Sequence, residues 1–592
     1  AVSQMLIERG FDPQTMFSIY NGVDFTPRTP AMGREDYLKS VGLEAGADDV
    51  VFGIAARLNP VKDVATLIRG FALAAKEHPN IRLLIAGDGE EREMLEKLAA
   101  ELCPKGSYVF AGWVTDMDSF YHALDVNTLT SLSETFPYAI TEGARMHCAT
   151  IASDVGGIPY IIEHGVTGLL FHPQDAEALG ACIGRLESRA MREQLGENLY
   201  EKASREFSID ATVGKQIEIY QTILRRTARA KEKRRGVLIC GAYGKGNAGD
   251  DAILKAILAQ MRHIDPDMPI YVLSHNPKQT RLRYHVGSVH AFDPFAFLPI
   301  MRRTKLFLSG GGSLIQDETS TRSLHYYLMS IRLAKRCGNK VLMYGCGIGP
   351  VHSASNRRHA AKVIDRCVDA ITLREDLSAE ELRSMGVTRP AVHITADPAL
   401  LLQPGTDGAV DSFLLSQKLD PAGGYALFVL RPWHEFAQRK QSFVEAAEYV
   451  HEKYGLTPVF FALEPNRDLG VTREVRTALR CESVLLPTPE DETLIIGMMK
   501  RMRLVVSMRL HTLIFASSVG APLVAVSYDP KVTGFMRYIG QKHCTAFETL
   551  TPEGLRGEID AALAAQERYD VSHLHALAEE NEQIARKLME EA

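Results

Sequence analysis

Arg509 and His511 stand two residues apart in the segment SMRLHTLIFA, where an apolar strand is expected to give way to a helix. At such a turn both side chains can point towards the mouth of a cleft. A guanidinium binds phosphate or carboxylate through two parallel hydrogen bonds, and an imidazole titrates near neutrality, so it can serve as a general acid or base. The pair favours chemistry on an anion, whereas a lone histidine at such a turn is more often structural.

Two further cations follow predicted strands in the same half of the chain. Arg374 ends the strand of AITLREDLS and is a second candidate anion clamp, although an ion pair with Glu375 or Asp376 would explain it equally well. Lys531 lies in SYDPKVTGF, after another strand. These positions extend the predicted anion site beyond Arg509.

Three glycine-rich segments, CGAYGKGNAGDD, LSGGGSLIQD and YGCGIGP, are expected to be loops after three strands of one sheet. Glycine lets backbone N–H groups approach an anion or a sugar closely, although a single turn of this kind is equally typical of tight packing. We expect these loops to form a shallow floor that a substrate or another backbone segment can enter. The candidates there are Asn247, Asp250, Gly311, Gly312, Asp317 and Asp397, the last two as acceptors of hydroxyl protons.

The first half of the chain carries a different set of candidate residues. Arg57 follows the strand VVFGIAA, and Lys62 lies just before a helix. Two cations near a helix N-terminus suit a diphosphate, because the helix dipole and free N–H groups add to their charge. Glu134 and Glu142 follow in SETFPYAITEGARM, and a Gly-Gly pair follows the next strand. Each feature alone is weak, but together and in this order along the chain they form a strong pattern.

The elements that must position these residues are those of α/β domains. Short apolar runs alternate with amphipathic stretches from residue 50 onward, which is typical of doubly wound, Rossmann-like parallel sheets. A second series of strands starts at residue 236, and a Gly/Pro/Asp-rich connection around 401–424 divides that half into two sheets facing a cleft. Ligands of such sheets bind outside the carboxyl ends of the strands, where the candidate residues fall.

Composition narrows the class of protein. The 592 residues are 46% hydrophobic and 24% charged, with a net charge of -6, which suits a globular protein and gives no support to nucleic-acid binding. Nine cysteines without a C-x-x-C pair indicate reduced thiols and a cytoplasmic location. No histidine or cysteine cluster has metal-ligand spacing, so we expect no essential metal.

The start of the sequence and the stretch between its two halves allow further predictions. No run of 18 apolar residues predicts a transmembrane helix, and no signal peptide opens the chain. The sequence begins without Met, which suggests a fragment. The stretch 225–235 holds seven basic residues and one acidic residue. We expect a solvated helix end and linker there, with contact to anionic lipid headgroups at the inner face of the membrane as the alternative.

The motifs of the first half, about residues 1–225, resemble the carboxyl-terminal domain of retaining family-4 glycosyltransferases of the GT-B fold. The resemblance implies that Arg57 and Lys62 hold the diphosphate of a donor such as a UDP-sugar. It also implies that Glu134 and Glu142 contact the donor sugar and ribose. NGVD at residues 21–24 matches the interdomain crossing of that family. The family's amino-terminal domain is missing, so transfer by this half alone is doubtful.

The series AYGKGNAGDDAIL, LSGGGSLIQD, YGCGIGP, TLREDLS, TADPAL, SMRLHTLIFA and SYDPKV resembles the polysaccharide pyruvyl transferase family over about residues 236–565. The resemblance implies transfer of pyruvate from phosphoenolpyruvate to a sugar, often N-acetylmannosamine, as a 4,6-linked ketal. It also implies that Arg509, Leu510 and His511 bind phosphoenolpyruvate, with His511 as general acid. The family decorates secondary cell-wall polymers of S-layer-bearing bacteria, so a lipid-linked or polymeric saccharide is the expected acceptor, and no cofactor is expected.

The leading interpretation is therefore a fusion of a glycosyltransferase with a pyruvylating partner. The alternatives are a second GT-B glycosyltransferase that uses a nucleotide sugar, and a non-catalytic sugar-binding scaffold. The expected domains are a remnant and crossing (1–30), a donor-binding domain (31–225), a basic linker (226–235), a first Rossmann-like domain (236–400) and a second with a terminal helix (401–592).

Overall fold

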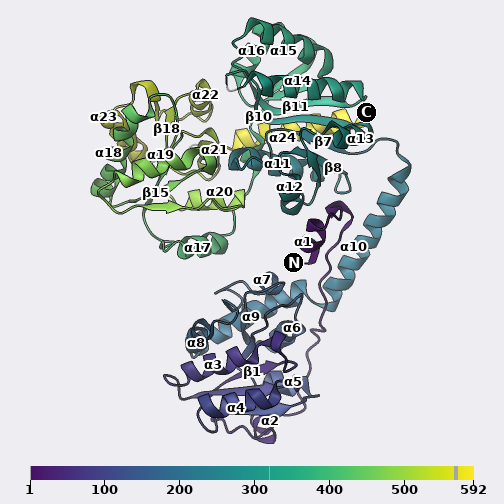
Figure 1. The fold of residues 1–592 in the computed structure, drawn as a ribbon, viewed down its shortest axis with the longest axis vertical. Helices are drawn as coiled ribbons and strands as arrows, with labels where there is room; N and C mark the ends of the chain where they lie inside the picture. The colour runs from purple at the N-terminus through teal and green to yellow at the C-terminus, as the bar shows by residue number, and fades with distance from the viewer. Residues whose placement is uncertain (1, 319, 566–570) are drawn as a thin grey trace. The chain divides into compact units, whose positions relative to one another are not determined.

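The computed structural model describes residues 2–318, 320–565 and 571–592. The chain divides into two compact units (Figure 1). Unit 1 comprises Met16–Thr227 with the segment that ends at Arg9, and unit 2 comprises Ala228–Ala592 with Gly10–Thr15. This division falls within the basic stretch 225–235.

Unit 1 contains one parallel six-stranded sheet in the order β3-β2-β1-β4-β5-β6. Its strands are β1 (Val50–Ala55), β2 (Ile81–Ala86), β3 (Tyr108–Gly112), β4 (Val126–Leu129), β5 (Ala149–Ser153) and β6 (Leu169–Phe171). The central strands are almost wholly buried because helices cover both faces, which is why they read as continuous apolar runs.

The helices of unit 1 are α1 (Val2–Glu8), α2 (Arg34–Ser40), α3 (Val64–Ala74), α4 (Arg92–Leu102), α5 (Met117–His122), α6 (Tyr138–Arg145), α7 (Ile158–Ile161), α8 (Ala176–Arg185), α9 (Arg189–Glu206) and α10 (Ile209–Ala228). The chain leaves β1 towards β2 and later returns to the other side of β1 with β4. The strand order therefore reverses between β1 and β4, and a ligand is expected beside this point.

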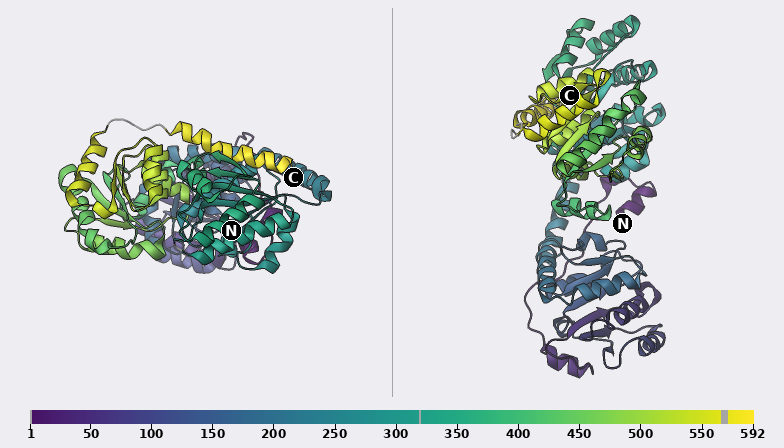
Figure 2. Two further views of the ribbon diagram at one scale, coloured as in Figure 1. Left: turned by 90° about the horizontal axis from the view of Figure 1, so that it is seen from above. Right: turned by 90° about the vertical axis from the view of Figure 1, so that its left-hand side faces the viewer.

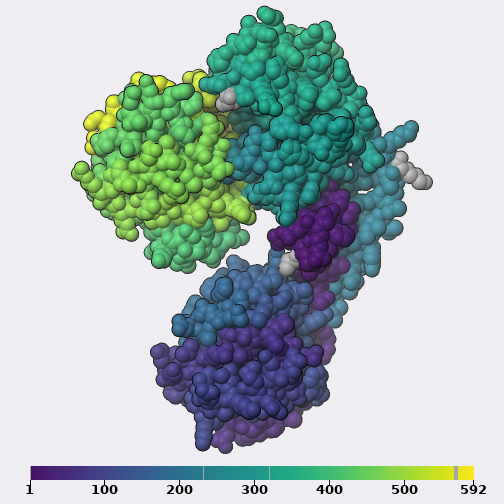
Figure 3. All heavy atoms as spheres, in the orientation of Figure 1, coloured from purple at the N-terminus to yellow at the C-terminus, as the bar shows by residue number. Residues whose placement is uncertain are grey.

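Unit 2 contains two parallel sheets, one of seven strands and one of six. The first has the order β13-β12-β11-β10-β7-β8-β9 and the second β16-β15-β14-β17-β18-β19. In the space-filling view the first-sheet half is teal and the second-sheet half green (Figure 3). The predicted fold class of Rossmann-like parallel α/β sheets is confirmed, with two sheets in the second half of the chain.

The strands of the first sheet are β7 (Val237–Cys240), β8 (Ile270–Ser274), β9 (Gly287–His290), β10 (Leu306–Ile315), β11 (Lys340–Ile348), β12 (Ala370–Leu373) and β13 (Ala391–Ile394). The helices along it are α11 (Ala248–Ile264), α12 (Pro277–Tyr284), α13 (Pro294–Arg303), α14 (Thr321–Arg336), α15 (Ala354–Cys367) and α16 (Asp376–Met385).

The strands of the second sheet are β14 (Tyr425–Val429), β15 (Thr457–Phe461), β16 (Val484–Leu486), β17 (Leu504–Ser507), β18 (Leu523–Ser527) and β19 (Cys544–Ala546). The remaining helices are α17 (Asp407–Ser416), α18 (Phe436–Tyr454), α19 (Pro465–Thr477), α20 (Glu492–Lys500), α21 (Leu510–Ser518), α22 (Pro530–Tyr538), α23 (Pro552–Ala564) and α24 (Ser572–Glu590).

The prediction of loops is wrong for two of the three glycine-rich segments. The glycines of LSGGGSLIQD and YGCGIGP lie mainly within the strands β10 and β11. Strands β10 and β11 pair through Gly310 with Tyr344, Gly312 with Cys346 and on to Ile315, across an irregularity. A β-carbon on Gly311 would lie 2.1 Å from Ile253 of α11, so the glycines let this helix pack tightly on the sheet. The segment between β7 and α11 is a loop, as predicted.

Helix α24 packs on the first sheet of unit 2, although the sequence predicts it as part of the second Rossmann-like domain. Its apolar residues Leu574, Ala578 and Leu588 join the core that includes Tyr344 of β11. Asn581 of α24 donates a hydrogen bond of 3.0 Å to the carbonyl of Ala396. Figure 2 shows this yellow helix along the teal elements. The end of the chain therefore ties the two halves of unit 2 together.

No helix in the described part of the chain combines the length and the apolar character that a membrane crossing requires. The basic stretch between the units makes specific contacts. Arg229 pairs with Asp265 at 2.7 Å, Arg234 donates to the carbonyl of Thr304 at 2.8 Å, and Arg235 donates to that of Asp267 at 2.6 Å. These three side chains attach the start of unit 2 to its first sheet.

Candidate active sites

A polar pocket of about 170 Å³ lies in unit 2, where residues from both of its sheets meet. Each contributing segment follows or ends a parallel strand, so the pocket lies outside the carboxyl ends of the strands, as doubly wound sheets require. We refer to it as the cleft pocket. Its lining residues are Asn247, Ser313, Arg374, Arg431, Leu463, Arg509, Leu510, His511, Tyr528, Asp529, Lys531 and Val532.

His511 lies in the first turn of α21, directly after β17 and the N-cap residue Arg509. Its Nε2 atom is 4.0 Å from a carboxylate oxygen of Asp397 and has no hydrogen-bond partner among the described residues. Burial lowers the pKa of His511 to about 4, with Asp397 opposing this effect and Arg374 adding to it. The imidazole is therefore neutral at pH 7, with one nitrogen free to act on a ligand.

Arg509 is held by two carboxylates. Its Nε atom donates to Asp468 at 3.1 Å, and a terminal nitrogen donates to Glu464 at 2.9 Å and also contacts Asp468. Asp468 is fully buried, so this network fixes the guanidinium firmly at the pocket wall. Much of the charge of Arg509 is thereby balanced within the protein.

Arg374 is buried and pairs with Asp397, with 2.6 Å between the guanidinium and the carboxylate. A second nitrogen donates to Ser313 at 3.3 Å. The sequence left Glu375 and Asp376 open as ion-pair partners of Arg374. Among the described residues, Arg374 forms its ion pair with Asp397 instead. Asp397 also caps the short 3-10 turn Pro398–Leu401, so its predicted role as a proton acceptor competes with two structural roles.

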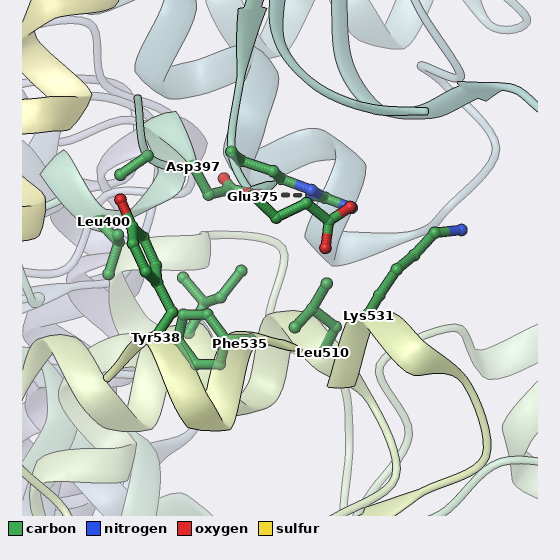
Figure 4. Close-up of a pocket in the computed structure, with 10 residues that line it drawn as sticks. Glu375, Asp397, Leu400, Leu510, Lys531, Phe535 and Tyr538 are labelled. Carbon is green, nitrogen blue, oxygen red and sulfur yellow. Dashed lines mark hydrogen bonds and ion pairs between the residues drawn. The ribbon is translucent and has the colours of Figure 1, made fainter. Parts of the chain in front are cut away.

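Lys531 reaches the cleft pocket from the first turn of α22, and among the described residues its one ion-pair contact is a long one, 3.8 Å, with Asp529. It also lines a small neighbouring pocket, together with Leu510 and Phe535. Figure 4 shows this neighbouring pocket, in which the carboxylate of Glu375 points towards Leu510 and the side chain of Lys531 extends away from the other labelled residues. The predicted donor-binding residues Arg374, Arg509, Leu510, His511 and Lys531 therefore all line one pocket.

The predicted acceptor candidates divide into two groups. Asn247 lines the cleft pocket, caps α11 and donates to Asp250 at 2.8 Å. Burial, reinforced by the neighbouring Asp251, raises the pKa of Asp250 to about 7, while Arg374 opposes this shift. Gly312 lies against Asp250, since its β-carbon would be 3.2 Å from the carboxylate. The start of α11 thus brings a carboxyl group that titrates near neutrality close to the cleft pocket.

Asp317 has a different role from the one expected. Its carboxylate accepts hydrogen bonds from the backbone of His352 and Ser353 and from the side chain of Asn356. These bonds lower its pKa although burial acts the other way. Asp317 lines neither the cleft pocket nor its small neighbour. It anchors the segment before α15 instead of facing the cleft.

Arg431 and Tyr528 also line the cleft pocket, although neither was predicted from the sequence. The side chain of Arg431 donates to the hydroxyl of Tyr528 and lies over its ring, 4.6 Å from the centroid. The sequence could have indicated Arg431 as a site residue, because it follows the apolar strand in YALFVLRPW.

Unit 1 has a larger pocket, about 520 Å³, which is lined by Arg57, Lys62, Glu134 and Glu142 together with Trp113. Lys62 pairs with Glu134 at 2.5 Å, and the hydroxyl of Tyr121 is 3.2 Å from Glu142. Arg57 follows β1 and Glu134 follows β4, so the pocket lies where the strand order reverses. All four predicted nucleotide-sugar residues therefore come together.

The Gly-Gly turn after β5 supports this pocket. A β-carbon on Gly156 would lie 1.9 Å from the carbonyl of Glu134, and one on Gly157 would lie 1.7 Å from the carbonyl of Thr135. The backbone N–H of Gly157 donates to Glu134 at 3.1 Å. Only glycine allows this approach, so the turn holds the segment that carries Glu134. In the described ranges, no group of three or more histidine, cysteine or acidic side chains has the arrangement of a metal site.

Doubly wound sheets with pockets at their carboxyl edges define a Rossmann-like architecture in both units. The particular families follow from comparison with known proteins. Residues 247–530 match the family model of the polysaccharide pyruvyl transferases, and residues 40–202 match that of the glycosyl transferases group 1. The predicted fusion of these two families is therefore confirmed, and transferase activity is supported.

The similar curated proteins are mainly glycosyltransferases. An uncharacterised glycosyltransferase of Methanocaldococcus jannaschii is 26% identical over 217 residues, which are 36% of this chain and 55% of the relative. The lipopolysaccharide core biosynthesis glycosyltransferase LpsE of Rhizobium meliloti is 29% identical over 188 residues, 32% of this chain and 54% of the relative. The chain thus spans about half the length of these relatives.

Among solved structures, Anabaena HepE in complex with UDP and glucose is 24% identical, with a TM-score of 0.34 and coverage of 38% of this chain and 60% of that chain. The C-terminal domain of the Francisella tularensis group 1 glycosyl transferase LpcC is 23% identical, with a TM-score of 0.29 and coverage of 32% and 100%.

Proposed function

We propose that unit 2 transfers pyruvate from phosphoenolpyruvate to a saccharide as a ketal. The observation that carries the proposal is the cleft pocket itself, which brings His511 together with Arg374, Arg509 and Lys531 at the edges of two sheets. Phosphoenolpyruvate carries up to three negative charges, and a site rich in cations stabilises them. The match to the pyruvyl transferase family over residues 247–530 supports the same reaction.

The size of the cleft pocket helps to separate this reaction from its alternative. Pockets for drug-sized ligands span about 300–1,000 Å³. The pocket of unit 1, about 520 Å³, falls in that range, whereas the cleft pocket has about 170 Å³. This favours a compact anionic donor in unit 2 over a nucleotide sugar, and therefore favours pyruvyl transfer over a second glycosyltransferase.

His511 is the proposed proton donor. A proton moves from its imidazolium to the methylene carbon of phosphoenolpyruvate, which leaves an oxocarbenium-like centre at C2. One sugar hydroxyl attacks C2, the bond from C2 to the phosphate oxygen breaks, and a second hydroxyl closes the ketal. Of the two hydroxyl protons, one returns to His511 and the other leaves with phosphate. Because free His511 is neutral at pH 7, the bound anion must raise its pKa before this step.

We further propose that the acceptor is a lipid-linked or polymeric saccharide bearing N-acetylmannosamine, pyruvylated at positions 4 and 6, at the inner face of the membrane. Unit 1 would bind a UDP-sugar through Arg57, Lys62, Glu134 and Glu142. The similarity to glycosyltransferases supports this role. Joining consecutive steps on one acceptor would raise the effective concentration of substrate at the second site.

Calorimetric titration of phosphoenolpyruvate into the purified chain tests the proposal, with phosphate release from N-acetylmannosamine glycosides as the turnover assay. We expect saturable binding in the wild type. The His511→Gln variant should still bind the donor but lose at least about 100-fold in turnover, the usual contribution of a general acid. Absence of donor binding, with and without acceptor, would overturn the proposal. Competition between UDP and phosphoenolpyruvate would favour a second glycosyltransferase instead.

A further inference from the structure

Most of the arginine charge at the cleft pocket is already balanced. Arg509 contacts the carboxylates of Glu464 and Asp468, and Arg374 pairs with Asp397. A cation that is paired in this way contributes less to the binding of an additional anion, because the carboxylate repels the incoming charge. A donor with several negative charges therefore needs a cation whose charge is not balanced by the protein.

Arg431 meets this requirement. Its contacts are with the hydroxyl and ring of Tyr528 and with the ring of Trp433, whose centroid is 5.5 Å from the guanidinium carbon. Within the described ranges no carboxylate forms an ion pair with Arg431, and its Nε atom is buried without a hydrogen-bond partner. The aromatic rings fix the plane of the guanidinium but leave its charge uncompensated.

The position of Arg431 in the fold points in the same direction. The second sheet of unit 2, β16-β15-β14-β17-β18-β19, has the same strand order as the sheet of unit 1, β3-β2-β1-β4-β5-β6. Strand β14 corresponds to β1 in this order. Arg431 follows the end of β14 by two residues, as Arg57 follows the end of β1. Both arginines therefore stand at the point where the strand order reverses, which is where such sheets bind ligands.

We propose that Arg431 is a donor-binding residue of unit 2 and adds to the site a positive charge that no carboxylate of the described residues balances. This proposal rests on the proposed use of phosphoenolpyruvate. Arg431 then contacts the donor beside Arg374, Arg509 and Lys531, which line the same pocket. Tyr528 and Trp433 hold the guanidinium in position.

The chain offers a direct reporter of this contact, because it has only two tryptophans. Trp113 lines the pocket of unit 1, and Trp433 lies beside Arg431. In a Trp113→Phe background, fluorescence therefore reports on Trp433 alone. We expect phosphoenolpyruvate to change this signal saturably, with the same Kd as calorimetry gives.

In this background, Arg431→Gln should raise the Kd for phosphoenolpyruvate by about tenfold or more, the usual effect of removing a charge-assisted contact. Arg431→Lys, which keeps the charge but loses the planar fork, should have an intermediate Kd. Arg473→Gln is the matched control, since Arg473 is exposed on α19 and lines neither pocket of unit 2. Far-ultraviolet circular dichroism and Tm establish that each variant is folded.

The outcomes are distinguishable. If the parent protein binds phosphoenolpyruvate and folded Arg431→Gln binds it equally well, the assignment of Arg431 is overturned while the proposed function stands. The same holds if Arg431→Lys and Arg431→Gln both match the Arg473→Gln control. If the parent itself binds no phosphoenolpyruvate by either method, the proposed function fails, and the role of Arg431 fails with it.

Discussion

The imidazole of His511 lies directly against Gly249, so that a β-carbon on this glycine would be only 2.3 Å from Nδ1. Gly249 is the second residue of α11, beside the first sheet of unit 2, whereas His511 is the second residue of α21, after a strand of the second sheet. Real β-carbons do not approach a ring atom so closely. The first turn of α11 therefore limits the positions that the imidazole of His511, the proposed general acid, can take.

Gly249→Ala should displace the ring of His511 and reduce kcat for phosphate release by about 100-fold, since a shift of about 1 Å in a catalytic group can cost that much. The fold should persist, because alanine is favoured over glycine within a helix. Steady-state kinetics with phosphoenolpyruvate and acceptor measure the effect. Wild-type kcat in this variant would contradict the inferred position of His511.

Gly470→Ala provides the matched control for this substitution. Gly470 lies within α19, and beyond its chain neighbours and the adjacent backbone of that helix no heavy atom of the described residues is within 4 Å of the position that a β-carbon would take, so alanine fits without displacement. This variant should keep full activity and gain up to about 1 kcal/mol of stability from the better helix propensity of alanine. The comparison separates a general effect of glycine replacement from the specific displacement of His511.

Binding of phosphoenolpyruvate at pH 7 should take up protons. The pKa of His511 is lowered to about 4, so the free protein holds a neutral imidazole. The negative charge of the donor favours imidazolium and raises this pKa. Calorimetry in buffers of different ionisation enthalpy measures the uptake, which we expect to approach one proton. His511→Gln should remove this contribution.

Asp250 is the second group that can bind a proton in this experiment, because its pKa of about 7 lies at the working pH. A bound anion would raise that pKa further. Asp250→Asn isolates the part that belongs to His511, and the double variant should show almost no uptake. Equal uptake in wild type and His511→Gln would assign the proton to another group.

Much of the cleft pocket could be predicted because parallel strands bring their carboxyl ends to one edge. Arg374, Arg509, His511 and Lys531 follow different strands, and this rule alone places them together. Their partners could not be predicted in the same way. The pairing of Arg509 with Asp468 joins segments 41 residues apart, and the spacing of residues along the chain does not encode such a contact.

The glycine-rich segments show another limit of sequence analysis. Glycine after an apolar run is typical both of a turn and of a strand against which a helix packs closely. Ile253 of α11 packs against Gly311, so this glycine belongs to a strand that a helix covers closely and not to a turn. That contact depends on the tertiary packing. For the same reason Asp317, which resembles a residue at the edge of a cleft, instead binds the backbone ahead of α15.

Asp250→Asn should raise the Tm of the protein above pH 7 and have less effect towards pH 4. The folded-state pKa is about 7, above the ordinary value of 3.8. Between these values the folded state binds more protons than the unfolded state, so the free energy of unfolding falls as the pH rises. Asparagine removes the ionisation and with it this loss. Thermal unfolding from pH 4 to pH 8.5 measures the difference.

Asp365→Asn is a control for which we expect the opposite change in Tm. Asp365 accepts backbone hydrogen bonds from Thr388 and Arg389, both 2.8 Å, which lower its pKa. Its ionised form therefore stabilises the fold above the unfolded-state pKa, and this contribution is lost as the pH falls. Asp365→Asn should lower the Tm at pH 7 and matter less in acid. If Asp250→Asn lowers the Tm at pH 8, as Asp365→Asn is expected to do, the raised pKa of Asp250 is contradicted.

Lys62→Met should weaken the binding of UDP to unit 1 by about tenfold, because Lys62 is a cation just before the N-terminus of α3 in the proposed diphosphate site. Its contact with Glu134, 2.5 Å, also holds that carboxylate at the pocket, so the binding of a UDP-sugar should suffer at least as much as that of UDP. In a Trp433→Phe background, the fluorescence of Trp113 at the same pocket reports the binding.

Lys76→Met is the matched control, since Lys76 is exposed and does not line this pocket. Equal UDP affinity in the two variants would show that Lys62 does not bind the diphosphate, and would leave Arg57 as the remaining predicted cation of the site.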